Sequence, residues 1–400
     1  MLKKQIKLIY YGSINSPTGV STVIHNIING FEKCNSLAIN VYTNTVGLHK
    51  LNKNKKHFIK PIFRFIHNLL SFLAGKFVIF TDLYIWTQYH RNAINISKKF
   101  HYDNISDNTI LFFHDVFTPY HFKKIHNLYW ENNKKTIVLH TDGDVFKMLY
   151  TYYPLLTKNK NRLIFYEKLA LDLLSDMDII ILLSNNAKEI FCTKYPFFLN
   201  KVIVIPNGLD IKTVMNKNVN TSDKFVFTTV GTLSYRKGQD LIIKAVELMS
   251  DSERNSFIVN IVGDGLIFNE LQSYCKHNKI TNINFLGTRR DIDELLSMSD
   301  CFILASRDEG LPMAIIEAMA NELPIISTNV GGIPDLVVDE LNGLLVDPNN
   351  EYNLKNAMLR LINMPYEDRS KMGKESLSRY TNNYTQEIMT KSYLEMFRSI

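Results

Sequence analysis

The chain has 400 residues, 46% of them hydrophobic and 21% charged, which suits two domains of about 200 residues each and excludes a disordered chain. Its four cysteines form no C-x-x-C pair, which argues against a disulfide framework or a cysteine zinc cage and fits a reduced compartment. Residues 1–205 carry 26 Lys and Arg against 13 Asp and Glu, whereas residues 206–400 carry 20 against 26, so the first half is expected to meet an anionic surface or substrate.

In the first half, short apolar runs alternate with helical patterns. We predict strands at Ile6–Tyr11, Ala38–Thr43, Thr109–Phe113, Thr136–Leu139, Ile179–Leu183 and Val202–Ile205, with helices such as Val20–Glu32 and Leu163–Leu174 between them. Several strands are apolar throughout, which is typical of parallel sheets covered on both faces. This rhythm predicts a doubly wound α/β domain over residues 1–205.

The N-terminal segment runs directly into a glycine loop and lacks a small-residue cleavage site, so we interpret it as a strand and not as a signal peptide. No window of about 18 uninterrupted apolar residues predicts a transmembrane helix. A cytoplasmic protein, at the inner face of the cell membrane, fits these features. The loop Gly12–Val20, GSINSPTGV, does not match the dinucleotide fingerprint G-x-G-x-x-G. An ordinary strand–helix turn is the alternative for this loop.

Residues 33–81 contain eight Lys or Arg and no Asp or Glu. Among them, residues 61–80 read PIFRFIHNLLSFLAGKFVIF, whose apolar positions fit one face of a helix. A basic cluster beside an aromatic amphipathic helix is typical of membrane-surface segments, so we expect peripheral contact with an anionic membrane through residues 50–80. A core helix beside a solvated lysine loop is the alternative. We expect no nucleic-acid partner, because the chain has no binding motif for one.

Two histidines follow predicted strands of the first half. His114 comes directly after Thr109–Phe113, and His140 directly after Thr136–Leu139. Ligands of parallel sheets bind at the carboxyl ends of the strands, so both histidines are candidate ligand contacts, although a lone histidine is more often structural.

The strand–helix rhythm restarts after a turn-rich stretch, which predicts a linker over residues 206–222. Beyond the linker we predict strands at Phe225–Val230, Phe257–Val262, Ile283–Phe285, Cys301–Ala305 and Pro324–Ser327. They form a second Rossmann-like domain over residues 223–375. A helical pattern over residues 376–400 either caps this domain or returns to the first one. Two facing sheets would hold a substrate in the cleft between them.

The most informative segment, residues 301–332, reads CFILASRDEGLPMAIIEAMANELPIISTNVGG. A strand leads into a polar loop with Glu309, and Pro312 is a favoured first residue for a helix over Met313–Asn321. The free N–H groups and the dipole of that helix suit a diphosphate. Glu309 and Glu317 can accept hydrogen bonds from sugar and ribose hydroxyls. Two solvated glutamates on an ordinary strand–loop–helix unit are the alternative.

A second charged segment, Val230–Gly238, reads VGTLSYRKG. A strand ends at Gly231, and Arg236 and Lys237 follow in the loop. Cations at the carboxyl end of a strand can stabilise a leaving diphosphate, because arginine grips phosphate through two N–H groups and lysine acts as a point charge. A solvated basic turn is the alternative. Gly263 lies in a similar turn, Gly263-Asp264-Gly265, after the next strand.

Asp142-Gly143-Asp144 has the D-x-D pattern of sites that hold a diphosphate through Mn²⁺ or Mg²⁺. We favour helix capping by these carboxylates, because Arg236, Lys237 and a helix N-terminus already provide positive charge for a diphosphate. No metal and no other cofactor is therefore expected.

These motifs resemble the donor-binding signature of the family-4 retaining glycosyltransferases. The resemblance covers most of the chain, strongly across residues 200–350 and weakly across residues 40–110. It implies an α/β fold of the GT-B kind, in which two Rossmann-like doubly wound parallel-sheet domains face each other across a cleft. Gly-Leu-Pro stands here where many relatives have Gly-Phe-Gly, which leaves the identity of the donor sugar open.

The resemblance also implies roles for individual residues. Glu309 would contact the donor sugar, Glu317 the ribose, Arg236 and Lys237 the phosphates, and His140 the transferring sugar. Expected catalytic residues are Glu309, His140, Lys237 and Arg236; expected donor-binding residues are Gly19, Gly231, Arg236, Lys237, Gly263, Gly310, Leu311, Pro312, Met313, Ala314 and Glu317; Gly12 and His114 are expected on the acceptor side.

The implied activity is the transfer of a hexose or N-acetylhexosamine from a nucleotide-sugar, most often a UDP-sugar, to a hydroxyl of a glycan or lipid-linked acceptor. Cell-surface polysaccharide biosynthesis, such as that of capsule or lipopolysaccharide, is the implied setting. The resemblance implies retention at the anomeric carbon, and because no nucleophilic carboxylate is evident, we expect a front-face reaction. A nucleotide-sugar epimerase or phosphorylase on the same fold and a non-catalytic partner subunit are the alternatives.

Overall fold

The computed structural model describes residues 5–14, 19–34, 38–43, 77–100, 109–211 and 224–400. Most of the predicted membrane segment at 50–80 and of the predicted linker at 206–222 lies outside these ranges. The chain divides into two compact units. Unit 1 comprises residues 1–183, 187–205 and 390–400, and unit 2 comprises residues 184–186 and 206–389.

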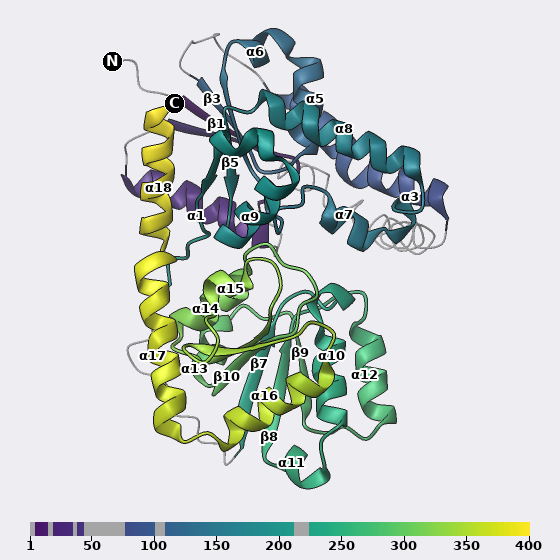
Figure 1. Cartoon of the computed structure of the whole chain (residues 1–400), viewed down its shortest axis with the longest axis vertical. Coiled ribbons are helices and arrows are strands. Elements are labelled where there is room, and N and C mark those ends of the chain that lie inside the picture. Colours follow the sequence, from purple (N-terminus) through teal and green to yellow (C-terminus); the bar gives the residue numbers. More distant parts are fainter. Residues whose placement is uncertain (1–4, 15–18, 35–37, 44–76, 101–108, 212–223) are drawn as a thin grey trace, which may run out of the picture. The chain divides into compact units, whose positions relative to one another are not determined.

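Unit 1 is built on a parallel six-stranded sheet with the strand order β2-β1-β3-β4-β5-β6. Figure 1 labels β1, β3 and β5 of this sheet. Its strands are β1 (Gln5–Tyr10), β2 (Ala38–Thr43), β3 (Thr109–Phe113), β4 (Lys134–Val138), β5 (Ile179–Leu182) and β6 (Val202–Val204). Strand β1 lies between β2 and β3, so the direction of winding reverses there. Open α/β sheets bind ligands at such a switch point, outside the carboxyl ends of the strands. The loops after β1 and β3 therefore occupy a ligand-binding position.

Helices cover both faces of this sheet. Phe112 of β3 packs against Phe397, with ring centroids 5.1 Å apart, and Phe397 also contacts Phe31. Phe113, whose side chain points to the opposite face, packs against Phe122 and Trp130. The helices of the unit are α1 (Gly19–Cys34), α3 (Val78–Ile85), the π-helix η2 (Trp86–His90), α4 (Arg91–Lys99), α5 (Phe117–Ile125), α6 (Asn127–Glu131), α7 (Lys147–Tyr152), the 3₁₀ turn η3 (Pro154–Leu156), α8 (Lys160–Asp176), α9 (Asn185–Lys194) and the 3₁₀ helix η4 (Pro196–Lys201).

Unit 2 has a second parallel six-stranded sheet, ordered β12-β11-β10-β7-β8-β9. Its strands are β7 (Phe225–Val230), β8 (Phe257–Val262), β9 (Ile283–Gly287), β10 (Cys301–Leu304), β11 (Ile325–Thr328) and β12 (Gly343–Val346). Its helices are the 3₁₀ turn η5 (Tyr235–Lys237), α10 (Gln239–Glu247), α11 (Asp251–Asn255), α12 (Phe268–His277), α13 (Ile292–Ser297), α14 (Met313–Ala320), α15 (Ile333–Leu336), α16 (Glu351–Asn363) and α17 (Tyr366–Asn383). Strands β7 and β10 are neighbours although two strands separate them in the sequence, so the switch point of this sheet lies between them.

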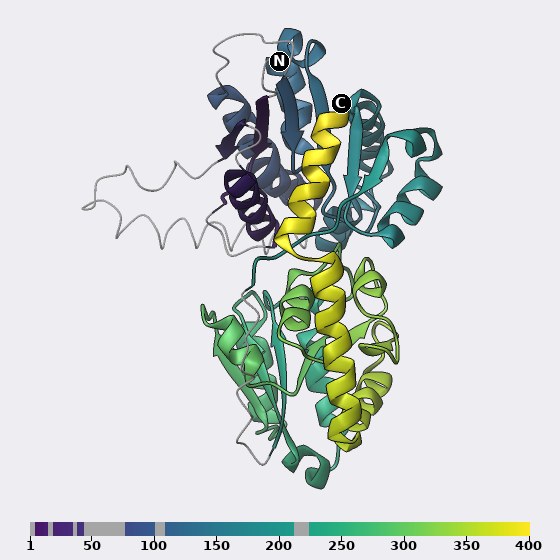
Figure 2. The same ribbon diagram turned by 90° about the vertical axis from the view of Figure 1, so that its left-hand side faces the viewer.

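The C-terminal region forms two helices where the sequence predicts one over residues 376–400. Helix α17 ends at Asn383, and α18 runs from Gln386 to Ser399 (Figures 1 and 2). The backbone of Leu209 enters at the break, where its N–H donates to the Tyr384 carbonyl and its carbonyl accepts from the Gln386 N–H, over 3.0 and 2.8 Å. These contacts take backbone groups that a continuous helix would use itself. Residues 390–400 of α18 belong to unit 1, where Tyr393 and Phe397 pack on Phe112.

None of the helices in the described ranges is both long and apolar enough to cross a membrane. The predicted strands agree closely with the observed ones, and four of them, β2, β3, β7 and β8, have the predicted bounds. Strand β12 was not predicted. It has four residues, GLLV, and begins with glycine, a residue that is depleted in strands.

Candidate active site

The charged residues of unit 2 meet at the switch point between β7 and β10. Arg236 and Lys237 lie on the 3₁₀ turn η5 that follows β7, and Glu309 lies in the loop that follows β10. Because neighbouring parallel strands end at the same edge of the sheet, these two loops face each other. The two segments that the sequence singled out separately therefore form one site.

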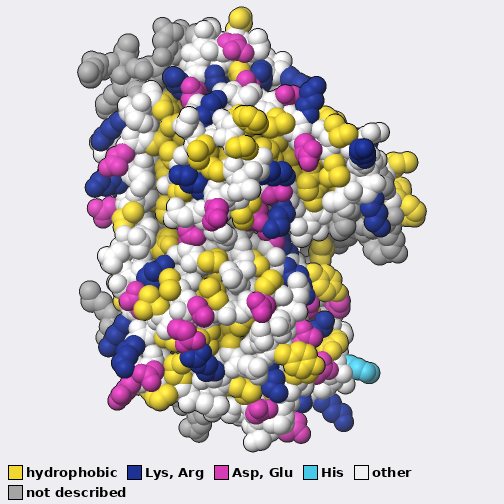
Figure 3. All heavy atoms as spheres, in the orientation of Figure 1, with side chains coloured by type: hydrophobic (Ala, Val, Ile, Leu, Met, Phe, Trp, Pro, Cys, Tyr) yellow, Lys and Arg dark blue, Asp and Glu magenta, His cyan; other side chains and the backbone are white. Residues whose placement is uncertain are grey.

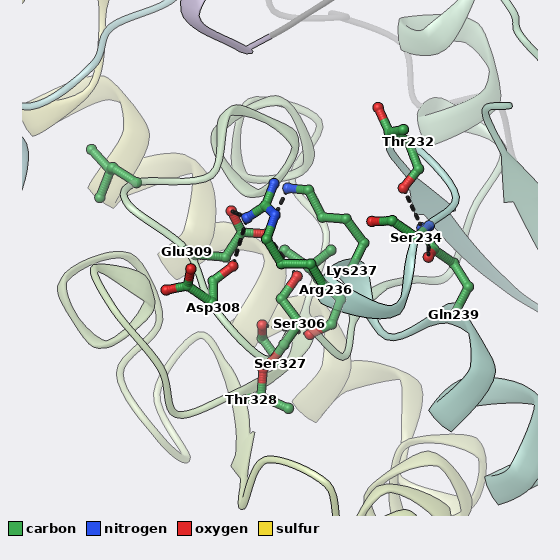
Figure 4. A network of polar contacts seen from close by, with 12 residues as sticks. Thr232, Ser234, Arg236, Lys237, Gln239, Ser306, Asp308, Glu309, Ser327 and Thr328 are labelled. Carbon is green, nitrogen blue, oxygen red and sulfur yellow. Dashed lines mark hydrogen bonds and ion pairs between the residues drawn. The ribbon is translucent and has the colours of Figure 1, made fainter. Parts of the chain in front are cut away.

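Lys237 and Arg236 both contact the Glu309 carboxylate. Lys237 Nζ donates to one carboxylate oxygen over 2.6 Å, and Arg236 Nη1 donates to the other over 3.3 Å (Figure 4). Arg236 Nη1 also donates to the carbonyl of Asp308 over 2.6 Å. Glu309 is 5% exposed, and the side chains of both cations are 16% exposed. The site therefore concentrates two positive charges and one negative charge in a desolvated position, where their interaction is strong.

The charge of Glu309 is fixed by its partners. Burial alone would raise the pKa of Glu309, but the nearby charges of Lys237 and Arg236 and hydrogen bonds from Lys237 and Ser306 outweigh burial and lower it. Ser306 Oγ donates to the same oxygen that Lys237 contacts, over 2.6 Å. The carboxylate is therefore ionised at neutral pH and is a strong hydrogen-bond acceptor.

Several side chains that shape this site were not predicted from the sequence. Ser306 donates to Glu309, and the carbonyl of Ser306 in turn accepts from the Thr328 hydroxyl on β11. Gln239, which is fully buried, accepts from the Ser234 N–H and donates to the Thr232 carbonyl, both over 3.3 Å (Figure 4). Ser306 could have been found from its place in the predicted Glu309 loop. Gln239 carries no signal in the sequence, because a polar residue at the start of a helix is ordinary.

Helix α14 begins immediately after the Glu309 loop. Pro312 has φ −71° and ψ 118° and occupies the N-cap, so the helix begins at Met313, as predicted. Its first-turn N–H groups therefore face the loop that carries Glu309. Leu311 and Met313 are buried, and the Leu311 carbonyl accepts from Asn207 Nδ2 over 3.2 Å.

Glu317 lies one turn further along α14 and is half-buried. Burial, with a smaller contribution from the negative charge of Asp293, raises its pKa to about 7. Within the described residues its carboxylate has no hydrogen bond or ion pair. Glu317 and Glu309 thus differ in environment, since a buried carboxylate without a cation holds its proton more tightly.

Two of the predicted glycines provide close backbone packing beside the site. Gly263 has φ +137°, and a Cβ at this position would lie 1.9 Å from the carbonyl oxygen of Gly231. Only glycine fits there, so the ends of β7 and β8 can approach closely. Gly310 is held in the Glu309 loop, where its carbonyl accepts from the Gly332 N–H over 2.7 Å. Ala314, the second residue of α14, is partly exposed.

The two predicted histidines of unit 1 contact each other. His114 Nδ1 and His140 Nε2 are 3.0 Å apart, and the two rings stack with centroids 5.3 Å apart. His114 is almost fully buried, and its Nε2 has no hydrogen-bond partner among the described residues. Burial lowers the pKa of His140 to about 4, and burial together with the proximity of His140 lowers the pKa of His114. Both imidazoles are therefore neutral at pH 7. The other ring nitrogen of His140, Nδ1, takes no part in the contact with His114.

The loop after β1 borders a cavity in unit 1. Gly12, Tyr11 and Ser13 line it together with side chains of α3, η2 and α4 that include Tyr84, Gln88, Tyr89 and Asn92. The cavity measures about 590 Å³, which is within the range of small-molecule sites. Gly19 is the first residue of α1 and is exposed.

The D-x-D carboxylates are paired with lysines. Asp142 accepts from Lys147 Nζ, and Asp144 accepts from Lys194 Nζ over 2.9 Å. Asp144 also accepts from the Phe146 N–H at the start of α7. Within the described ranges, no group of three or more His, Cys, Asp and Glu side chains is arranged to hold a metal ion.

Comparison with known proteins adds the family context. Residues 210–379 match the model of the family described as "Glycosyl transferases group 1". An Escherichia coli UDP-Gal:alpha-D-GlcNAc-diphosphoundecaprenol alpha-1,3-galactosyltransferase is 33% identical over 51% of this chain and 56% of its own length. An uncharacterised glycosyltransferase of Methanocaldococcus jannaschii is 34% identical over 41% of this chain and 44% of its own length. The chain thus spans about half the length of these curated relatives.

Solved structures share the fold over nearly the whole chain. Anabaena HepE in complex with UDP covers 99% of this chain and 100% of its own, with a TM-score of 0.66 and 17% identity. Sucrose-phosphate synthase of Thermosynechococcus elongatus covers 99% of each chain, with a TM-score of 0.71 and 14% identity. The similarity to these structures confirms the predicted GT-B fold class of two parallel six-stranded sheets with covering helices. The similarity to the group 1 glycosyl transferases thus spans residues 210–379, which is less than half of the chain.

Proposed function

We propose that this protein is a retaining glycosyltransferase that moves a hexose or N-acetylhexosamine from a UDP-sugar to a hydroxyl of a glycan or lipid-linked acceptor. The observation that carries the proposal is the cluster of Arg236, Lys237 and Glu309 at the switch point of unit 2. Relatives support the choice of donor: HepE was solved with UDP, and the name of the E. coli relative includes a UDP-sugar and a diphosphoundecaprenol acceptor.

Different groups of the site bind different parts of the donor. The diphosphate of the donor lies at the first-turn N–H groups of α14 and takes Arg236 and Lys237 as counter-ions. Glu309 then accepts hydrogen bonds from the sugar, and Glu317 accepts them from the ribose. The charges suit these tasks, since Glu309 is held ionised by its cations and Glu317 has no such partner among the described residues.

The proposed reaction proceeds on one face of the sugar. The bond between the anomeric carbon and the phosphate oxygen breaks, and the acceptor oxygen forms its bond to the same carbon from the same side. The proton of the acceptor hydroxyl passes to the leaving phosphate oxygen. Arg236 and Lys237 stabilise the charge that develops on that phosphate, and neutral His140 can hydrogen-bond the sugar through Nδ1.

In this scheme Arg236, Lys237 and the N-terminus of α14 neutralise the negative charge of the diphosphate, so we propose that the reaction needs no metal ion. In the first half of the chain, Asp142 and Asp144 pair with Lys147 and Lys194, which is the expected behaviour of structural carboxylates. Activity in the presence of EDTA is the direct test of this part of the proposal.

We further propose that the acceptor is reached at the cytoplasmic face of a membrane, as part of cell-surface polysaccharide synthesis. The outward face of α3 and η2 supports this. Ile79, Leu83 and Trp86 recur at the spacing of one helix face and are 79%, 44% and 50% exposed, whereas Thr81 and Ile85 on the other side are buried. A helix that is apolar on both faces needs a cover on the outer one. Hydrophobic side chains gather at this part of the surface (Figure 3).

Basic residues follow the element that packs against α3. Exposed Lys158 and Lys160 come shortly after η3, whereas Arg162, at the start of α8, is neutralised by its ion pair with Asp82 of α3. An apolar face with basic neighbours and an exposed tryptophan suits the headgroup region of an anionic membrane.

A panel of nucleotide-sugars tests the proposed function. Purified protein is incubated with each donor, with and without EDTA, and with extracted lipid-linked glycan as acceptor, and release of the nucleoside diphosphate is measured. We expect acceptor-dependent release of UDP that persists in EDTA. Isomerisation of the sugar without an acceptor would instead indicate an epimerase, and tight UDP binding without any transfer or hydrolysis would indicate a non-catalytic subunit. Loss of transfer in EDTA would contradict the metal-independent scheme.

A further inference from the structure

Arg307 lies in the loop after β10, two residues before Glu309, and every nitrogen of its guanidinium group has a protein partner. Nη1 and Nη2 donate to the two carboxylate oxygens of Asp240, each over 2.8 Å. Nε donates to Oδ1 of Asn349 over 2.6 Å, and Nη1 also donates to the carbonyl of Tyr235. A two-pronged contact between arginine and a carboxylate fixes direction as well as distance, so the position of this side chain is well defined.

The backbone of Arg307 adds a second connection to the same turn. Its N–H donates to the carbonyl of Arg236 over 2.8 Å. One residue thus holds two consecutive carbonyls, those of Tyr235 and Arg236, on the 3₁₀ turn η5. A turn of three residues has too few internal hydrogen bonds to satisfy its own carbonyls, so outside donors decide where it lies.

Close backbone packing reinforces this connection. Gly238, which ends η5 and caps α10, has φ +71°, and a Cβ there would lie 1.8 Å from the carbonyl oxygen of Ala305. The turn that carries the cations and the loop that carries Glu309 are therefore in contact on both sides of Arg236 and Lys237. A small shift of one segment relative to the other would change the 2.6 Å distance from Lys237 to Glu309.

We propose that Arg307 is a positioning residue that sets where Arg236 and Lys237 stand, and thereby the affinity of the site for the diphosphate of a nucleotide. The identity of that ligand rests on the proposed function. Arg307 acts through other residues, because each of its three guanidinium nitrogens already donates to Asp240, Asn349 or Tyr235. The Asp240 carboxylate is itself stabilised, since it lies in the first turn of α10, where the helix dipole favours a negative charge.

The geometry requires arginine and not merely a positive charge. Lysine carries the same charge but lacks the planar guanidinium group, so it cannot contact both oxygens of Asp240 and the Tyr235 carbonyl at the same time. Glutamine is neutral and shorter. Arg307→Lys therefore separates the effect of charge from the effect of position, and Asp240→Asn weakens the same contact from the other side.

The chain offers a matched control in the same unit. Arg360 contacts both carboxylate oxygens of Glu340 through Nη1 and Nη2, and both side chains are about half exposed. This pair has the same two-pronged form but involves neither η5 nor the Glu309 loop. Arg360→Lys and Arg360→Gln report on the cost of disturbing such a pair elsewhere in the unit.

The test compares the full-length variants by calorimetric titration with UDP and by amide hydrogen exchange of residues 234–241. Arg307→Lys and Arg307→Gln should each weaken UDP binding about tenfold or more and speed exchange in this segment. The unfolding temperature should stay close to that of the wild type. Asp240→Asn should act in the same direction, and the double variant Arg307→Lys/Asp240→Asn should be no worse than the stronger single variant, because both remove one contact. The Arg360 variants should change neither measurement.

Unchanged UDP affinity together with unchanged exchange in the Arg307 variants would overturn the inference. So would an equal loss in the Arg360 variants, since it would show a general effect on stability. If the wild-type protein bound no nucleoside diphosphate, the proposed function would fail. Hydrogen exchange would then still decide whether Arg307 holds residues 234–241 in place.

Discussion

Lys237 Nζ lies 2.6 Å from a carboxylate oxygen of Glu309. The same ammonium group is the one that we assign to the leaving diphosphate, so Glu309 and the diphosphate share a cation. Arg236, 3.3 Å from the other oxygen of Glu309, is shared in the same way. In the proposed scheme, binding of the phosphates draws positive charge away from Glu309 and leaves its oxygens available to the hydroxyls of the sugar.

Glu309→Gln should separate nucleotide binding from sugar transfer. The variant keeps the shape of the side chain but releases Lys237 and Arg236 from a competing carboxylate, so UDP should bind at least as tightly as to the wild type. Turnover should fall at least about 10²-fold, because the neutral amide is a weaker acceptor for the sugar hydroxyls. Calorimetry with UDP and a nucleotide-release assay measure the two effects. A large loss of UDP affinity would contradict the shared-cation scheme.

Lys237→Ala should impair both steps. Removing a fixed cation from a site of developing charge costs about 10²–10³-fold in turnover. UDP affinity should fall too, because one counter-ion of the diphosphate is lost. Lys244→Ala is the control, since Lys244 is exposed on α10 of the same unit. Turnover of the Lys237 variant near that of the Lys244 variant would show that Lys237 does not stabilise the leaving group.

Binding of a UDP-sugar should strengthen as the pH rises toward and past 7. Burial and the charge of Asp293 raise the pKa of Glu317 to about 7, so this carboxyl group is protonated below that pH and ionised above it. The ionised form is the stronger acceptor for the two ribose hydroxyls, so affinity should be lower at pH 6 than at pH 8, by up to about tenfold. A UDP-sugar is the right probe, because its phosphates do not titrate in this range. Glu317→Gln should remove the dependence, and an unaltered slope in that variant would assign it to another group.

Gly238→Ala should destabilise unit 2 far more than Gly287→Ala. Both glycines have positive φ, +71° and +64°, so alanine is strained at either position by about 1 kcal/mol. A Cβ at Gly238 would also lie 1.8 Å from the Ala305 carbonyl oxygen, whereas nothing lies within 4 Å of one at Gly287. The additional displacement should raise the loss in the free energy of unfolding to at least about 3 kcal/mol. Urea denaturation measures the difference, and equal losses would show that the two backbone segments are not in close contact.

Vesicle flotation tests the membrane contact through α3. The double variant Leu83→Ser/Trp86→Ser should reduce binding to vesicles that contain phosphatidylglycerol at least about tenfold, since each apolar side chain contributes about 1.5–3 kcal/mol when buried. Phe197→Ser is the control, because Phe197 is 89% exposed on η4 of the same unit. Binding should weaken in high salt. Equal binding by the two variants, or no binding by the wild type, would contradict the contact.

Much of the fold can be read from local patterns. Strand-like patterns of five or six residues, set between helical patterns, predict β2, β3, β7 and β8 with their observed bounds. The break between α17 and α18 cannot be read in this way, because the apolar periodicity continues through Tyr384. The break depends on the backbone of Leu209, which lies far away in the sequence.

For the site, the amino-acid sequence by itself determined which loops carry the charges: Arg236 and Lys237 after one strand, Glu309 after another, and Glu317 on the helix that follows. Local signals suffice there, since strand ends, glycines and Pro312 mark the loops. Only the tertiary structure decided that β7 and β10 are neighbours, and so that these loops form one site. The role of Arg307 is likewise invisible in the sequence, where it is one more charged residue in a polar loop. Its partners Asp240 and Tyr235 are 67 and 72 positions away, and such contacts arise only when the sheet brings non-consecutive strands together.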